Sequence, residues 1–200
     1  MWVLEMVKMV VNTSTAYYKY TWATFSQPTL SANGTLGGSS FAVAASSERG
    51  GYSAWKAFAD GWDIIWHSNG EIPCWYTFYN PKVLKISKIQ ILNDPEVGCG
   101  NGTFQGSNDN GTYTNICSFT GSSSAGATWS FNPNNTTPYK YFRFWFTASH
   151  YSGFIVIRKI TLTAQVGTAG SGTSSNYDYT VVTKTAKTYV NGSTAYSLGS

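Results

Sequence analysis

Short runs of aromatic and β-branched residues, each closed by a turn sequence, dominate the middle of this chain. The runs VLKISKIQIL, YKYFRFWFT and FIVIRKITLTA span Val83–Leu92, Tyr139–Thr147 and Phe154–Ala164. Turn-forming sequences rich in Gly, Asn, Asp and Ser separate them, among them Asn93-Asp94-Pro95. Period-two alternation predicts half-buried strands. Helical spacing is limited to Ala54–Ala59, so the pattern predicts an all-β domain.

The run Tyr139–Thr147 has large side chains at both sets of alternating positions. One set is Phe142, Phe144 and Phe146, and the other is Tyr141, Arg143 and Trp145. Because both faces must then be covered, we expect a central strand of a β-sandwich. The arginine sits among aromatic residues, which favours a stacked or ion-paired structural role.

The composition argues against several classes of protein. Of the 200 residues, 11% are charged and 16% are aromatic, whereas a typical domain has ~25% charged residues. Coiled coils need more charge than this, and charge-driven disorder lacks aromatic residues. The net charge of +4 is spread without a basic run, which disfavours nucleic-acid binding. No apolar stretch reaches the ~18 residues of a membrane span.

The ends of the chain differ from its middle. The strand pattern predicts a domain over residues 26–165, preceded by an N-terminal arm over residues 1–25. Residues 166–176 are rich in Gly, Ser and Thr, which predicts a flexible linker. Residues 177–200 follow as a second β-prone arm.

The two arms contain a similar decapeptide. KMVVNTSTAY at residues 8–17 and KTYVNGSTAY at residues 187–196 share seven of ten positions. Either the similarity is chance between two Ser- and Thr-rich strands, or both arms form the same local structure. In the second case we expect a hairpin of the Asn-Gly type at Asn191-Gly192.

The chain has three cysteines, Cys74, Cys99 and Cys117, and no CxxC pair. An odd number cannot pair completely, so we expect free thiols in a protein that folds in a reducing cytoplasm. A Cys99–Cys117 bridge across a hairpin is the alternative. The N-terminal MWVLEMVKMVVN lacks the positive start, unbroken apolar core and cleavage site of a secretory signal.

The middle of the chain contains an ordered series of motifs over about 140 residues. In chain order the series is Ser46-Ser47-Glu48, Ala57-Phe58, Asp60-Gly61, Trp66, Ser68, Trp75, ISKIQIL, FQGSNDNGTY at Phe104–Tyr113, YKYFRFWF and VIRKITLTA. This series resembles the coagulation-factor type C, or discoidin, domain. The resemblance implies a galactose-binding-like jelly-roll β-sandwich with ligand-binding loops at one end. It implies binding without catalysis, most often of sugars, and function must still be argued from the site.

The residues themselves do not favour an enzyme. The chain has two histidines and nine acidic residues, and it contains no common catalytic or nucleotide-binding motif. Asp60 and Asp63 are close in sequence, as are Asp94 and Glu96. A glycosidase needs two carboxylates that face each other across a gap, and neighbours on one turn do not meet that need.

The resemblance also implies a structural calcium site between the Asp-Gly loop and an acidic residue near the last strand. Asp60 and Asp63 stand at the first position, but Lys159 replaces the acidic residue at the second. Calcium requires several oxygen ligands, and an ammonium group repels it. We therefore expect no cofactor, and either a lost site or an Asp60–Lys159 ion pair.

Candidate ligand contacts are aromatic, His and amide side chains on predicted loops: Trp62, Trp66, His67, Asn93, Asn101, His150 and Tyr151. The resemblance places aromatic and His contacts after the Asp-Gly loop, although Trp66 also suits a packing role. Related sugar-binding loops carry an arginine after the middle strand. Residues 93–101 contain none, which puts galactose-type specificity in doubt.

These observations predict a carbohydrate-binding adhesion module, exposed on a virion or at the cell exterior. The expected setting is a multivalent assembly such as a phage tail or head appendage, because single sugar sites are weak and need many copies. The expected partners are a cell-surface glycan and neighbouring subunits in a homo-oligomer. The alternatives are a structural decoration or fibre subunit that assembles through its arms, and an accessory domain of an enzyme.

Overall fold

The computed structural model describes residues 8–16, 19–61, 64–151, 153–170, 182–191 and 194–197. The chain divides into two compact units. One is a β-sandwich over Thr21–Thr168, and the other combines Met1–Tyr20 with Ala169–Ser200. No helix among the described residues is long and apolar enough to cross a membrane.

The strands assigned to the sandwich are β2 (Lys19–Thr24), β3 (Ala42–Ala45), β4 (Trp66–His67), β5 (Cys74–Leu92), β6 (Asn101–Ser107), β7 (Thr114–Phe119), β8 (Thr128–Phe131), β9 (Tyr139–Ala148), β10 (Val156–Ile157) and β11 (Lys159–Gly170). The one helical element in the described part of this unit is the 3-10 turn η1 (Ala54–Phe58). The all-β prediction is therefore confirmed.

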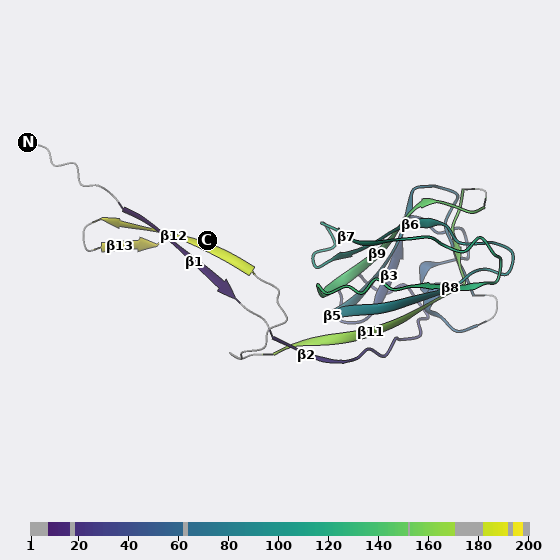
Figure 1. Ribbon diagram of the computed structural model, residues 1–200, viewed down its shortest axis with the longest axis horizontal. Coiled ribbons are helices and arrows are strands. Elements are labelled where there is room, and N and C mark those ends of the chain that lie inside the picture. The colour runs from purple at the N-terminus through teal and green to yellow at the C-terminus, as the bar shows by residue number, and fades with distance from the viewer. Residues whose placement is uncertain are drawn as a thin grey trace, which may run out of the picture. The chain divides into compact units, whose positions relative to one another are not determined.

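The long strand β5 (Figure 1) has different partner strands along its two parts. Its first part pairs with β3 and β9, and its second part, Val83–Leu92, pairs antiparallel with β8 and β11. A register shift between Tyr79 and Leu84 separates the two parts. The strand order β2-β11-β5-β9-β6-β7 puts β9 between β5 and β6, the central position predicted for it.

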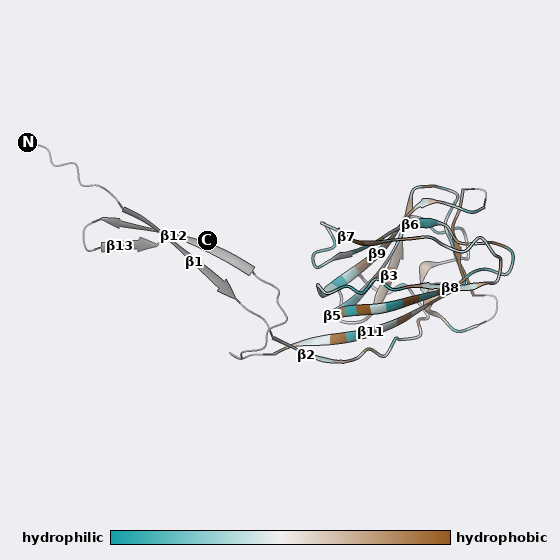
Figure 2. Ribbon diagram, in the orientation of Figure 1, coloured by the Kyte–Doolittle hydropathy of each residue, from teal (hydrophilic) through white to brown (hydrophobic). Residues whose placement is uncertain are grey.

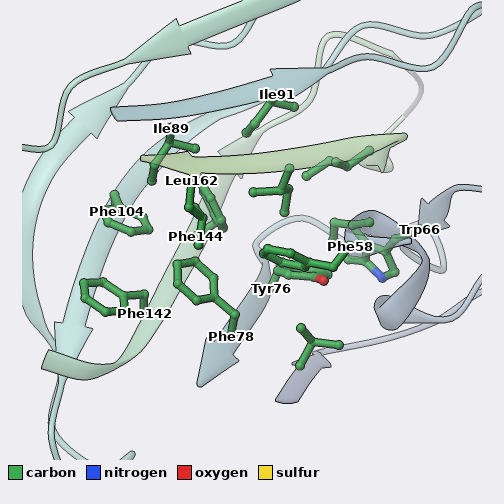
Figure 3. Close-up of a cluster of buried hydrophobic side chains, with 14 of the residues drawn as sticks. Phe58, Trp66, Tyr76, Phe78, Ile89, Ile91, Phe104, Phe142, Phe144 and Leu162 are labelled. Atoms are coloured by element: carbon green, nitrogen blue, oxygen red, sulfur yellow. The ribbon is translucent and has the colours of Figure 1, made fainter. Parts of the chain in front are cut away.

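Apolar and polar residues alternate along β5 and its neighbours (Figure 2), and the apolar positions form a core rich in rings (Figure 3). Phe142 and Phe144 of β9 are fully buried. The Phe78 and Phe142 rings are 5.2 Å apart, and those of Phe104 and Phe144 are 5.1 Å apart. Ile89 and other aliphatic residues of the opposite layer complete the core. Each such side chain contributes about 1.5–3 kcal/mol by burial.

The other face of β9 is half-buried, and Arg143 has the structural role predicted for it. Its guanidinium carbon lies 3.8 Å from the Tyr113 ring centroid and 5.1 Å from that of Trp145. Its Nε donates to Gln105 Oε1 at 2.8 Å. Planar stacking of this kind suits arginine better than lysine.

The second unit contains β1 (Lys8–Ala16), β12 (Val182–Asn191) and β13 (Thr194–Ser197). β1 and β12 pair antiparallel over nine residues, and β12 and β13 form a hairpin whose last pair is Asn191 and Thr194. The copy of the decapeptide at residues 187–196 therefore spans this hairpin. The copy at residues 8–17 instead lies almost wholly in β1, so the hypothesis that both copies form the same structure is wrong.

The predicted boundaries differ from the observed elements at two points. β11 continues to Gly170 and pairs with Val83 at Gly167, so residues 166–170 of the predicted linker form a strand. β2 lies within the predicted N-terminal arm, yet it joins the main sheet beside β11. The rest of the predicted linker, residues 171–176, lies outside the described residues.

All three cysteines are free. The Cys99–Cys117 alternative fails on register, because the backbone of Cys99 pairs with Ser122 whereas Cys117 lies opposite Phe104. Burial raises the pKa of the Cys74 and Cys99 thiols to about 12. Cys117 is half-buried.

Candidate functional site

Loops that follow β3, β5 and β9 meet around a cavity of about 570 Å³, here called the loop cavity. The residues that matter for its chemistry are Arg49, Tyr52, His67, Asp94, Glu96, Tyr151 and Phe154. The short β4–β10 pair, in which His67 lies opposite Val156, holds two of these loops together. The backbone bond from Arg49 N to His67 O closes the loop after β3 onto β4, and the bond from Arg158 N to Leu92 O ties the end of β5 to the segment after β10.

His67 is at the centre of the contacts in the loop cavity and is only 7% exposed. Its Nδ1 contacts the Ser68 carbonyl oxygen, and a carbonyl can only accept, so Nδ1 donates. Its Nε2 then accepts from Arg49 Nη1 at 3.4 Å. The imidazole stacks on Phe154 with centroids 4.5 Å apart, and Tyr52 lies 5.8 Å away. These contacts fix the ring and direct the arginine towards the cavity.

Tyr151 is 50% exposed and is the one large hydrophobic residue so exposed in the described chain. Its ring packs edge-on against Phe154 at 5.4 Å. Ser149 Oγ accepts from Tyr151 N and lies 2.5 and 2.6 Å from the carbonyl oxygens of Tyr151 and Phe154. An exposed ring on a loop held in this way is preorganised for contact with a ligand.

The acidic wall of the loop cavity comes from the turn after β5. Asp94 Oδ1 accepts from Glu96 N at 2.9 Å, and the Asp94 carbonyl accepts from Gly126 N at 2.6 Å. Asp94 thus shapes the turn, while the Glu96 side chain is exposed. The cavity has both a cation and a carboxylate on its rim.

The structure brings His67 and Tyr151 together among the predicted ligand contacts, and it places two others away from any ligand. Trp66 is 0% exposed in the core, with its Nε1 donating to Ser47 O. Asn93 is also 0% exposed. Its Nδ2 donates to Ser122 O and Ser124 O, and its Oδ1 accepts from Trp129 Nε1. Both predictions are corrected, because these residues hold the fold and reach no solvent.

Two further predicted contacts, Asn101 and His150, do not line the loop cavity. Asn101 Oδ1 accepts from Gly121 N at 3.1 Å, and His150 Nε2 lies 3.0 Å from Gly121 O. Both side chains therefore fasten the same turn. Trp62 lies outside the described residues.

The sequence reasoning missed Arg49, Tyr52 and Phe154, and it assigned Asp94 and Glu96 to a turn alone. An arginine does line the loop cavity, but it comes from the loop after β3. Its position beside the Ser46-Ser47-Glu48 motif was the available signal. Phe154 was read as the start of a strand, although it precedes β10.

The predicted Asp60–Lys159 ion pair is present. Lys159 Nζ lies 2.6 Å from Asp60 Oδ1, and Thr29 Oγ1 donates to Asp60 Oδ2 at 3.1 Å. These hydrogen bonds, first that from Lys159, lower the pKa of the Asp60 carboxyl. Within the described residues no three His, Cys, Asp or Glu side chains cluster as metal ligands, and Asp63 lies outside them.

No family model and no curated protein matches this chain. Among solved structures it is similar to three family 32 carbohydrate-binding modules from Clostridium perfringens. The first, from a family 31 glycoside hydrolase, has a TM-score of 0.51 and 19% identity over 60% of this chain and 93% of that one. The second, from a family 89 glycoside hydrolase in complex with GalNAc-β-1,3-galactose, has a TM-score of 0.53 and 16% identity over 62% and 94%.

The third is the module of NanJ in complex with galactose, with a TM-score of 0.50 and 18% identity over 64% of this chain and 93% of that one. Sequence identities this low show a shared fold and say nothing about the ligand. The described sandwich therefore has the galactose-binding-like β-sandwich fold of family 32 carbohydrate-binding modules.

Proposed function

We propose that the sandwich is a non-catalytic carbohydrate-binding module and that the loop cavity is its binding site. One observation carries the proposal: the exposed Tyr151 ring stands beside Arg49, His67 and Glu96 in one cavity. Sugar rings present C–H groups that stack on an aromatic face. Their hydroxyls take hydrogen bonds from arginine and give them to a carboxylate.

The acidic residues of the loop cavity favour binding over hydrolysis. Asp94 and Glu96 come from one turn, and Asp94 already accepts the backbone N–H of Glu96. A glycosidase holds its two carboxylates on opposite sides of the scissile bond. The solved structures with this fold support the proposal, since one contains galactose and another GalNAc-β-1,3-galactose.

We place this module on a multivalent surface assembly, for instance a virion tail or head appendage that attaches to a host. The course of β11 supports the placement. Lys159 pairs with Leu92, directly before the acidic turn of the loop cavity, and the strand runs away from there. The chain leaves the sandwich at Thr168, about 30 Å along this strand. A binding site far from the point where the chain leaves the sandwich can face a ligand on another surface. Many copies of the module would compensate for the weak binding of a single site.

A structural subunit is the second candidate function. The pairing of β1 with β12 over nine residues favours it, because the two ends of the chain then build one sheet. In this case the arms bind neighbouring subunits and the loop cavity has no ligand.

A glycan array with the full chain, followed by calorimetry on the glycans it binds, tests the proposal. We expect Tyr151→Ala and Arg49→Ala each to weaken binding at least about tenfold, which corresponds to ~1.4 kcal/mol. Lys82→Ala, an exposed lysine outside the cavity, is the matched control and should bind normally. An array without any bound glycan, or variants that bind like the parent chain, would refute the proposal and favour the structural subunit.

A further inference from the structure

We infer that the site is an extended track for an acidic oligosaccharide chain, rather than a pocket for one terminal sugar. This inference rests on the proposed function and adds a substrate class to it. It also assigns a role to Trp55 and Lys56, which lie outside the loop cavity.

Five rings and one lysine form a continuous series of contacts, here called the ring track. Its members, in spatial order, are Tyr151, Phe154, His67, Tyr52, Lys56 and Trp55. The ring centroids lie 5.4, 4.5 and 5.8 Å apart from Tyr151 to Tyr52. Lys56 Nζ then lies 5.7 Å from the Tyr52 centroid and 5.8 Å from that of Trp55. Each step is similar in length to one pyranose unit.

The ring track has accessible surface on both sides of the buried His67. Tyr151 is exposed, and Phe154, Tyr52 and Trp55 are half-buried. The cavity of about 570 Å³ is in the range that takes a drug-sized ligand, which is larger than a single sugar ring. A chain that fills the cavity can therefore continue over Tyr52 onto Trp55.

The far end of the ring track is positively charged. Lys56 Nζ donates to Gly51 O at 2.5 Å, which holds the ammonium between the two rings. The nearby Glu48 carboxylate accepts from Asn33 Nδ2 and Ala54 N instead. In the described part of the chain no carboxylate forms a salt bridge with Lys56 or Arg49.

Lys56, a cation without a carboxylate partner in the described residues, favours an anionic group at this end of the ring track, such as the carboxylate of a uronic acid unit. The loop cavity itself holds Glu96 beside Arg49, and the Glu96 carboxylate suits the hydroxyls of a neutral unit and repels a second acid. The ring track therefore suits an oligosaccharide whose acidic unit lies over Tyr52 and Trp55, beside the Lys56 ammonium.

Calorimetry with the full chain at low salt tests the inference with three probes. The probes are galactose, a galacturonic acid tetramer and the same tetramer with its carboxyl groups reduced to alcohols. We expect both tetramers to bind more tightly than galactose, and the acidic tetramer to bind more tightly than the reduced one. Lys56→Gln should remove the difference between the tetramers, about two- to fivefold for an exposed ion contact.

Trp55→Leu keeps apolar packing but removes the ring, so it should weaken both tetramers and leave galactose unchanged. Lys82→Gln makes the same charge change off the track and should alter nothing. Tetramers that bind no better than galactose, or an acidic preference that survives Lys56→Gln, would overturn the inference. If none of the probes binds at about 1 mM while the glycan array finds another ligand, the inference fails and the proposed function stands. If the array is also blank, both fail.

Discussion

Replacing Asn93 with alanine should make the sandwich less stable to unfolding. This result would show that Asn93, which the sequence suggests as a ligand contact, has a structural role. The amide is fully buried. Its Nδ2 donates to the carbonyl oxygens of Ser122 at 3.0 Å and Ser124 at 2.8 Å. Its Oδ1 accepts from the Trp129 indole at 2.9 Å. The single side chain thus joins the turn after β5 to two other segments.

The expected cost follows from these three bonds. A typical hydrogen bond contributes about 1 kcal/mol to stability, and a buried partner left unpaired costs at least as much. Asn93→Ala should therefore lower the free energy of unfolding by about 3 kcal/mol. With a urea m-value of about 2 kcal/mol per M, the midpoint should fall by about 1.5 M.

Urea unfolding followed by tryptophan fluorescence measures this change. Asn101→Ala is the matched control, because its side chain is half-buried and accepts one bond, from Gly121 N. It should cost about 1 kcal/mol or less. The reasoning is refuted if Asn93→Ala costs no more than the control, and a loss of glycan binding at unchanged stability would restore Asn93 as a ligand contact.

Three further outcomes test other parts of the structure. Asp60→Asn should lower the urea midpoint at pH 7, and the difference from the parent chain should fade as the pH falls below 3.8. The reason is that folding lowers the pKa of this carboxyl, so its contribution to stability is lost when it is protonated. A difference that stays constant with pH would contradict the ion pair. Gly102→Ala should lower the free energy of unfolding by about 3 kcal/mol or more, since the added Cβ would lie 2.0 Å from a backbone oxygen of β9. Gly50→Ala has open space around the added Cβ and should unfold like the parent chain. A thiol reagent at pH 8 should label Cys117 alone in the folded protein and all three cysteines in urea, and any labelling of buried Cys99 before unfolding would argue against the described packing.

The strands were predictable because their signal is local. The side chains of Val83–Leu92 and Tyr139–Thr147 alternate with the pleat, and a buried face demands that alternation whatever the partner strand. The ring-filled core follows from the same pattern. The extent of β5 was not predictable, since Asn80 and Pro81 interrupt the run in sequence. Pairing with β3 and β9 on one side of that interruption and with β8 and β11 on the other makes it one strand.

The candidate site was predicted only in part. His67 and Tyr151 were selected because aromatic and His side chains on loops are suited to sugars, and both line the loop cavity. Trp66 was selected by the same rule and Asn93 as an amide on a predicted loop, yet both side chains are buried. A loop has no fixed period, so residue spacing does not say which of its side chains face solvent.

By itself, the sequence determined the strand content and the resemblance to a known β-sandwich. It also determined that at least one of the three cysteines is unpaired within the chain, and that Asp60 and Lys159 carry opposite charges. Only the tertiary structure decided that Arg49, Tyr52 and Phe154 share a cavity with His67. These residues come from loops up to 105 positions apart, and their meeting depends on which strand ends the sandwich places together. Side-chain alternation acts between neighbours along a strand, whereas a binding site is formed by the convergence of loops in space.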